Sequence, residues 1–205
     1  MKKKLYIPLA LILVTGVIYF SQSGEESLGD YTQKISQVRK EKNEFMKSST
    51  ESPFYNQKEK FGKLKYFDPN LDFKVKARVE RIETRSYLDL ATSTGKSEKY
   101  LKFAYARFEL KGQEMKLLLL KKASGGKSEP IFAAFADDSS GNSTYGGGRY
   151  LDLSFKNATR IELDFNLAYN PYCAYIESFS CPFPPAENIL PIAITAGEKL
   201  YHENK

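Results

Sequence analysis

The first regular pattern along the chain is a helical stripe that begins near residue 28. Apolar side chains recur there at intervals of three or four residues, and the positions between them are mostly charged. Ser27 followed by Asp30 is typical of a helix start, while Ser48 opens a polar run that leads to Pro53 and ends the helix. The sequence therefore predicts one amphipathic helix with a solvated charged face. Its apolar stripe consists of Leu28, Tyr31, Ile35, Val38 and Phe45.

From residue 71 the period of the pattern shortens to two. Apolar and charged side chains alternate from Leu71 to Glu80, which indicates a strand with one buried face. Lys111-Gly112-Gln113 fits a tight hairpin connection. The whole pattern predicts a mainly β fold, an antiparallel sandwich or barrel-like sheet with the N-terminal helix packed on it. The remaining β patterns fall at 86–91, 100–110, 114–121, 130–136, 149–155, 158–165 and 189–195.

The N-terminus carries a targeting pattern. Three lysines, Lys2 to Lys4, precede an uncharged apolar run at residues 5–20, through which we expect the chain to meet a membrane. As a helix this run would cover about 24 Å, which lies between a signal-peptide core and the roughly 30 Å hydrocarbon core of a bilayer. A retained inner-membrane anchor and a cleaved signal both stay open. Either one leaves the rest of the chain in the cell envelope, outside the cytoplasm.

We therefore expect three parts in the chain. Residues 1–23 form the N-terminal membrane anchor or signal peptide, residues 24–30 a polar tether, and residues 31–205 a single β-rich domain. The chain is long enough for that domain to bury a core without a metal or disulfide staple.

Composition narrows the classes of function. The chain has 31 Lys and Arg against 25 Asp and Glu, and the targeting segment holds three of the lysines, so no nucleic-acid partner is expected. His202 is the single histidine, which argues against most metal sites and Ser-His-Asp triads, and no cofactor is expected. Asp137 opens a run similar to a calcium loop, but Gly148 stands where that loop requires a bidentate glutamate.

Candidate chemistry concentrates between residues 144 and 199. Three glycines precede Arg149, whose guanidinium is suited either to grip an anionic ligand or to pair with an internal acid, Asp164 or Glu187. The irregular segment 166–188 follows a strand, and polar side chains in such a loop either bind a ligand or satisfy the loop's own backbone. The candidate ligand-binding residues are Arg149, Asp164, Asn166, Tyr169, Asn170, Glu187 and Asn188.

Many short strings of this sequence resemble one bacterial family. They are Ser52-Pro53, Phe61-Gly62, Thr144-Tyr145-Gly146, Gly148-Arg149-Tyr150-Leu151, Asp164-Phe165-Asn166, Ala168-Tyr169-Asn170-Pro171, Cys173-Ala174-Tyr175, Cys181-Pro182, Glu187-Asn188 and Ala196-Gly197-Glu198-Lys199. Over about residues 35–201 the chain is similar to the family known as domain of unknown function 1684. The resemblance implies a β-rich single domain and carries no established activity.

Two functions of different classes remain open. The first is an exported or membrane-tethered module, not an enzyme, that binds a small polar ligand or an envelope protein. The second is a cysteine-dependent hydrolase or transferase that uses Cys173 or Cys181 as its nucleophile. A thiolate nucleophile needs a base or a cation to lower its pKa. Because the only histidine is at the C-terminus, Arg149 or Lys199 would have to serve.

Cys173 and Cys181 are also predicted to form a disulfide. They are the only cysteines, and export would carry them to an oxidising compartment. The bridge would close a short loop and contribute roughly 2.5 kcal/mol in the chain-entropy model. The resemblance implies that the cysteine pair belongs to the whole family, including members we expect in the cytoplasm, where the pair would instead be packed or reactive thiols.

Overall fold

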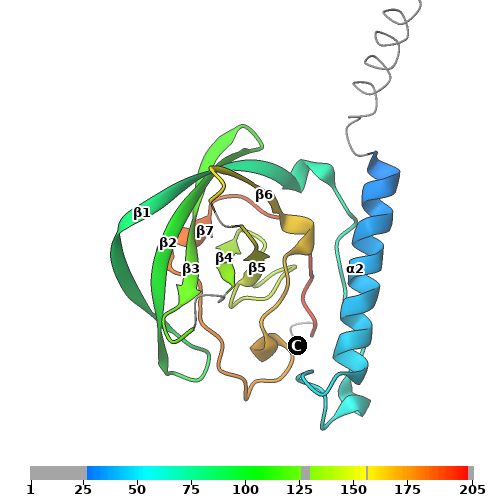
Figure 1. Ribbon diagram of the computed structural model, residues 1–205. Coiled ribbons are helices and arrows are strands. Elements are labelled where there is room, and N and C mark those ends of the chain that lie inside the picture. Colours follow the sequence, from blue (N-terminus) through cyan, green and yellow to red (C-terminus); the bar gives the residue numbers. More distant parts are fainter. Residues whose placement is uncertain (1–26, 126–129, 156, 203–205) are drawn as a thin grey trace, which may run out of the picture. The chain divides into compact units, whose positions relative to one another are not determined.

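The computed structural model describes residues 27–125, 130–155 and 157–202 (Figure 1). The chain divides into two compact units, Met1–Lys34 and Ile35–Lys205. The helix α2 spans Leu28–Ser48, as the apolar stripe predicts. At its start the Ser27 hydroxyl accepts a hydrogen bond from the backbone N–H of Asp30 at 3.1 Å, which is the expected capping contact.

All of the strands described lie in the unit that starts at Ile35, and they form a curled antiparallel sheet, a half-barrel (Figure 1). The predicted mainly β fold with an N-terminal helix is thereby confirmed. The strand order is β5-β4-β3-β2-β1-β6, and β7 pairs with β4 off this path. The strands are β1 (Lys74–Ala91), β2 (Ser97–Leu110), β3 (Gln113–Lys122), β4 (Ile131–Asp137), β5 (Arg149–Leu153), β6 (Arg160–Asp164) and β7 (Ile189–Leu190).

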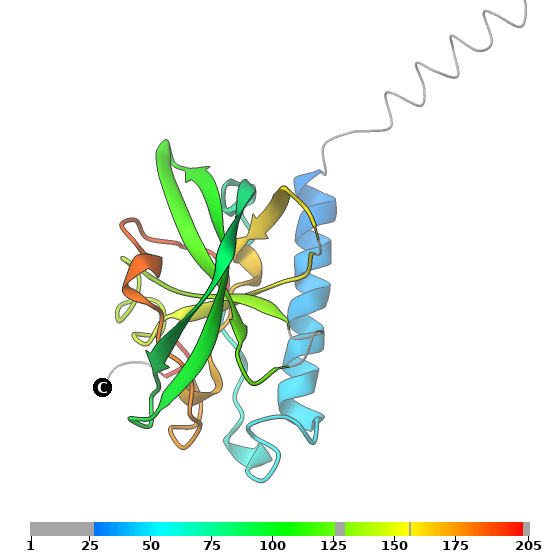
Figure 2. The same ribbon diagram turned by 60° about the vertical axis from the view of Figure 1, so that its left-hand side comes forward.

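Strand β1 is longer than the sequence pattern suggests. The predicted strands at 71–80 and 86–91 are one strand from Lys74 to Ala91, with an irregular register against β2 between Arg81 and Ser86. Such a bulge interrupts the alternation of side chains, because it inserts residues without a partner and bends the strand. Figure 2 shows the strong twist of the long strands β1 and β2.

The hairpin between β2 and β3 follows the prediction. Lys111 and Gly112 occupy its tip with φ of 51° and 75°, the left-handed region that a two-residue hairpin turn requires. The neighbouring strand β3 is buried on both faces, and each of its four leucines, Leu117 to Leu120, is 0% exposed. Two of them face the main core, and the other two pack with Leu90 and Tyr100.

The C-terminal third of the domain is mostly irregular. The predicted strand at 189–195 shortens to β7, which pairs in parallel with β4 through Ala136 and Asp137. The loop before it, predicted to be irregular, contains short 3₁₀ turns. The 3₁₀ turns of the chain are η1 (Lys58–Lys60), η2 (Leu71–Phe73), η3 (Phe165–Leu167), η4 (Tyr172–Ala174) and η5 (Ala186–Asn188).

Within the ranges that the structure covers, no helix is long and apolar enough to cross a membrane. The predicted anchor or signal peptide at 1–23 and residues 24–26 of the predicted tether at 24–30 lie outside the described residues.

Candidate functional site

Arg149, the first candidate from the sequence, lies inside the domain. Its side chain is 0% exposed, and Nη2 donates to Asp137 Oδ2 at 2.9 Å and to the Ile194 carbonyl at 2.8 Å. Nη1 donates to the carbonyl of Ala196. Burial lowers the pKa of Arg149 from its ordinary value, and the Asp137 carboxylate opposes this shift. Arg149 thus pairs with an internal acid, which is Asp137 and neither Asp164 nor Glu187.

Gly148, directly before Arg149, allows the close packing around this buried side chain. Gly148 has a φ of 84°, and a Cβ there would lie 2.6 Å from the Phe135 carbonyl oxygen and 2.5 Å from Pro184 Cγ. Only glycine fits a left-handed backbone with so little space around it. Gly148 therefore lets one segment of the chain approach another closely.

Asp164 and Asn166 connect the end of β6 to the segment before β1. Asp164 Oδ1 accepts hydrogen bonds from the backbone and side-chain nitrogens of Asn166, both at 3.0 Å. The Asn166 amide then donates to the Asn70 carbonyl and accepts from the Asn70 backbone N–H, both at 2.8 Å. These contacts satisfy backbone groups in a region that has no strand ladder.

Asn188 and Glu187 have a similar role near the middle of the sheet. Asn188 is 0% exposed; its amide donates to the carbonyls of Leu118 at 3.0 Å and Ala134 at 2.8 Å, and its oxygen accepts from the Leu118 N–H at 2.7 Å. The side chain thereby bridges β3 and β4, whose register contains a single residue pair, Leu120 with Phe132. Glu187 accepts from Lys102 and Tyr105 of β2.

Asn170 and Tyr169 belong to a buried cluster around Glu198. Glu198 is 1% exposed and accepts hydrogen bonds from the Asn170 N–H at 2.8 Å, from the Tyr175 hydroxyl at 2.6 Å and from Lys42 Nζ at 3.3 Å. Lys42 Nζ also lies 4.1 Å from the centre of the Tyr169 ring. Burial lowers the pKa of Lys42, and Glu198 opposes that shift. The sequence predicts no role for Glu198 beyond the family resemblance. Its place directly after Gly197 was the available signal, and the structure gives that glycine a φ of 76°.

The two cysteines are adjacent free thiols, and each is less than a tenth exposed. The Cys173 N–H donates to Cys181 Sγ at 3.3 Å, and the Tyr145 hydroxyl donates to Cys173 Sγ at 3.7 Å. A hydrogen bond from the Cys181 thiol lowers the pKa of Cys173 to about 6, and the same bond raises the pKa of Cys181. The sulfurs are close enough to be partners, and the disulfide stays a prediction.

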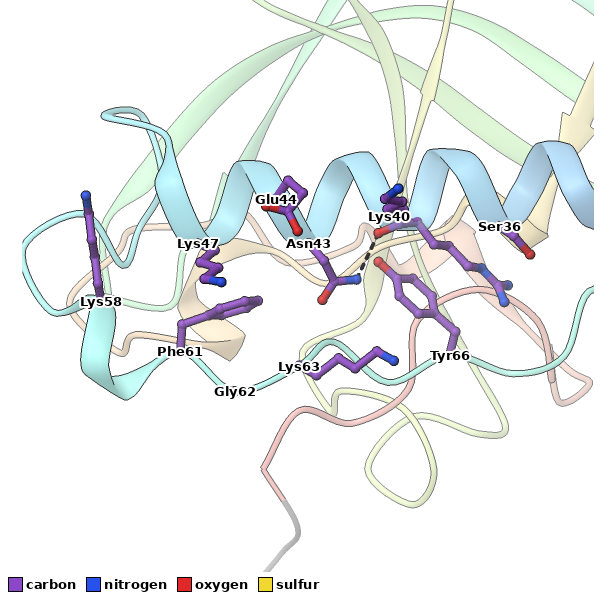
Figure 3. Close-up of a pocket in the computed structure, with 11 residues that line it drawn as sticks. Ser36, Lys40, Asn43, Glu44, Lys47, Lys58, Phe61, Gly62, Lys63 and Tyr66 are labelled. Carbon is purple, nitrogen blue, oxygen red and sulfur yellow. Dashed lines mark hydrogen bonds between the residues drawn. The ribbon is translucent and has the colours of Figure 1, made fainter.

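A groove that contains none of the predicted ligand-binding residues lies between α2 and the segment 58–66 (Figure 3). Its volume is about 630 Å³. One wall is a face of α2 and the other is the chain from η1 to Tyr66. We call it the basic groove; it is lined by Ser36, Arg39, Lys40, Asn43, Glu44, Lys47, Lys58, Phe61, Gly62, Lys63 and Tyr66.

Asn43 joins the two walls of the basic groove. Its oxygen accepts from the Leu64 N–H at 3.0 Å, and its amide donates to the Arg39 carbonyl at 2.8 Å, the bond drawn in Figure 3. The Arg39 guanidinium donates to the Phe67 carbonyl at 2.8 Å and lies 4.5 Å from the centre of the Tyr66 ring. Arg39 and Asn43 therefore fix the spacing of the walls.

Four lysines give the basic groove its charge. Lys40, Lys47, Lys58 and Lys63 are exposed, and among the described residues none of them is within ion-pair distance of a carboxylate. Glu44 is the only acid in the lining. The groove thus holds an excess of positive charge that nothing in the described part of the chain neutralises.

Tyr66 adds a polar group at the back of this groove. Figure 3 shows its hydroxyl end directed toward α2 beside Asn43. The oxygen is shielded from water and has no hydrogen-bond partner among the residues that the structure describes. Burial raises the pKa of Tyr66, so the group is a neutral O–H donor near pH 7. A buried hydroxyl without a partner is uncommon and calls for an explanation.

Metal binding finds no support in the described part of the chain. Among the described residues, no group of three or more His, Cys, Asp or Glu side chains is arranged so that it could hold a metal ion.

Comparisons with known proteins agree with the fold and leave the activity open. Residues 59–199 match the family model described as "Protein of unknown function (DUF1684)". A solution NMR structure of an uncharacterized protein of Haloarcula marismortui is similar, with 38% identity, a TM-score of 0.66, and coverage of 85% of this chain and 97% of that one. No curated protein matches. The family match spans most of the domain and confirms the resemblance, so the chain belongs to the DUF1684 family, whose function is unknown.

Proposed function

We propose that the domain is a non-catalytic module that binds a small anionic ligand in the basic groove. The observation that carries this proposal is the convergence of four exposed lysines on one concave surface, none of which has an ion-pair partner within the described part of the chain. Clefts lined by charges of one sign concentrate oppositely charged ligands. The sequence-based expectation of a small polar ligand is kept, but at a different set of residues.

The volume and the lining of the groove further restrict the class of ligand. Its volume of about 630 Å³ is within the range of small-molecule sites. Phe61 supplies an apolar surface, and the Tyr66 hydroxyl offers a donor that an anionic oxygen would satisfy. A compact group with several negative oxygens, such as a phosphate or a carboxylate cluster, fits this combination of charges and a neutral donor.

Calorimetric titration of the full chain in mild detergent tests the proposal. Inorganic pyrophosphate and citrate are the probes, because both are small polyanions. We expect binding that weakens as salt is added, since the lysines are exposed and their charges are screened. The charge-reversed double variant Lys58→Glu/Lys63→Glu should weaken binding at least about tenfold, or 1.4 kcal/mol.

The control has the same change of net charge at another place. Lys96 and Lys99 are exposed and lie outside the basic groove, so Lys96→Glu/Lys99→Glu should leave the affinity nearly unchanged. Equal losses in the two double variants would show a general charge effect and contradict a site. No detectable binding of either probe at millimolar concentration would also contradict the proposal.

We further propose that this domain acts in the cell envelope, tethered to or released from the inner membrane. Support comes from the three N-terminal lysines and the apolar run at 5–20. In that compartment an acidic envelope protein is an alternative occupant of the basic groove. A reporter that is active only in the cytoplasm, fused after Lys205, should stay silent. An active reporter would reject this location.

A cysteine-dependent enzyme is the second candidate, and the lowered pKa of Cys173 favours it. Its weakness is access, because the side chain is 6% exposed. Iodoacetamide distinguishes the cases: a nucleophile would react with the reagent quickly at pH 7 in the folded protein. A reaction as slow as global unfolding would mean a packed thiol, and two cysteines that resist alkylation even after denaturation without reductant would mean the predicted disulfide.

A further inference from the structure

A second cavity shares no lining residue with the basic groove, and its chemistry is different. It has a volume of about 290 Å³ and is lined by residues of β2, β3, β5 and the irregular loop. Aromatic residues dominate the lining, and Cys181 also borders it. We call it the aromatic pocket; its rings are Tyr100, Tyr150, Tyr169, Tyr172 and Phe179.

The rings are held in place by one another and by their hydroxyl groups. Tyr150 and Tyr169 meet edge to face with centroids 5.9 Å apart, and Tyr172 meets Phe179 in the same way at 5.4 Å. The Tyr150 hydroxyl donates to the Pro182 carbonyl at 2.6 Å, and the Tyr169 hydroxyl donates to Asp152 at 2.9 Å. The polar ends of these two rings are thus engaged within the domain.

A pair of opposite charges provides the polar part of the lining. Lys122 Nζ lies 3.0 Å from Glu98 Oε2, and the side chains are 45% and 26% exposed. The same oxygen accepts from the Tyr100 hydroxyl at 2.9 Å. An accessible carboxylate and ammonium side by side offer both an acceptor and a donor, but no excess of charge.

We propose that the aromatic pocket binds one ring of a neutral carbohydrate. A sugar ring has C–H groups on one face that stack on aromatic side chains, and hydroxyls at its edge that both donate and accept. The pocket combines these two features, and its volume is slightly below the range for drug-sized ligands, which suits a single ring. A polyanion fits poorly, because the one cation of the lining is already paired with Glu98.

Saturation-transfer NMR on the full chain tests this inference, with methyl glycosides of glucose, galactose and N-acetylglucosamine as probes. We expect at least one glycoside to bind with millimolar affinity. Phe179→Ala removes a ring from the loop and should weaken that binding about tenfold, or 1.4 kcal/mol. Glu98→Gln keeps the shape and removes the charge, and it should weaken binding to a similar degree.

Tyr87→Ala is the matched control, because Tyr87 is an aromatic residue 42% exposed that does not line the pocket. It should bind the glycoside as the unchanged chain does. If Phe179→Ala does not fold, Glu98→Gln alone decides. The inference is overturned if no glycoside binds, if all variants bind equally, or if phenol binds and the glycosides do not. Pyrophosphate binding should be the same in every variant, which separates this pocket from the basic groove.

Discussion

The buried polar interior and the basic groove use the same kinds of side chain in opposite ways. Arg149 in the interior makes its hydrogen bonds to one carboxylate and to backbone carbonyls, all within the chain. Lys58 and Lys63 in the groove are exposed, and neither forms an ion pair with a residue that the structure describes. Charged residues next to glycines and in an irregular loop stabilise this fold, whereas those on a helix face and in a short turn remain available to a ligand. A charged residue beside glycines or in an irregular loop is therefore not necessarily available to a ligand.

The largest expected effect concerns the interior. Arg149→Ala should lower the free energy of unfolding by about 3–5 kcal/mol, because it leaves the Asp137 carboxylate buried without its partner. Urea denaturation measures this change. Arg149→Met/Asp137→Leu removes both charges and should recover part of the loss. A loss below 1 kcal/mol for Arg149→Ala would mean that the fold does not depend on the ion pair between Arg149 and Asp137. The interior and the groove would then not differ in this respect.

Glu198→Gln should have the next largest effect, about 2–3 kcal/mol. The substitution keeps the shape of the side chain but removes the negative charge that accepts hydrogen bonds from Asn170, Tyr175 and Lys42. The same denaturation experiment applies. Glu44→Gln is the control, because that carboxylate is exposed at the groove and is in none of the described ion pairs. Equal effects at the two glutamates would remove the distinction between the regions.

Lys42 gives a pH-dependent test of the same comparison. Burial lowers its pKa in the folded state below the unfolded value of about 10.4. Between these two pKa values the unfolded chain binds more protons, so this lysine makes stability rise with pH across that window. The difference in unfolding free energy between the unchanged chain and Lys42→Met should therefore shift in favour of the unchanged chain from pH 7 to pH 10. A difference that stays constant or falls over this range would contradict the lowered pKa of Lys42.

Tyr66→Phe should have the smallest effect on stability, within about 0.5 kcal/mol, because the hydroxyl it removes has no partner among the described residues. The same variant should bind pyrophosphate more weakly. A clear loss of stability would instead reveal that the hydroxyl has a structural role, and the groove would then resemble the interior.

The architecture was largely predictable because it depends on local periodicity. The stripe from Leu28 to Phe45 and the alternation from Leu71 report on single elements, and both elements exist. The bulge in β1 between Arg81 and Ser86 and the shortness of β7 depend on neighbouring strands. The periodicity along one segment carries no information on the position of a bulge or on the length over which a strand finds a partner.

The partners of the polar residues were harder to predict. Arg149 meets Asp137 because β4 and β5 are antiparallel neighbours, with Phe135 opposite Arg149. The two predicted partners are engaged elsewhere, because Asp164 accepts from Asn166 and Glu187 accepts from Lys102. The basic groove was missed for a related reason. Its lysines belong to two segments, the solvated face of the helix and the chain after Pro53, and tertiary packing through Asn43 brings these segments together.

The acceptors for Arg149 have a consequence for how this protein is made. Two of them are the carbonyls of Ile194 and Ala196, and the Asn170 backbone N–H relies on Glu198. A nascent chain that ends before these residues has its sheet-forming sequences but lacks the groups that complete its interior. Folding of this domain must therefore wait until the segment that contains Ile194, Ala196 and Glu198 has been synthesised.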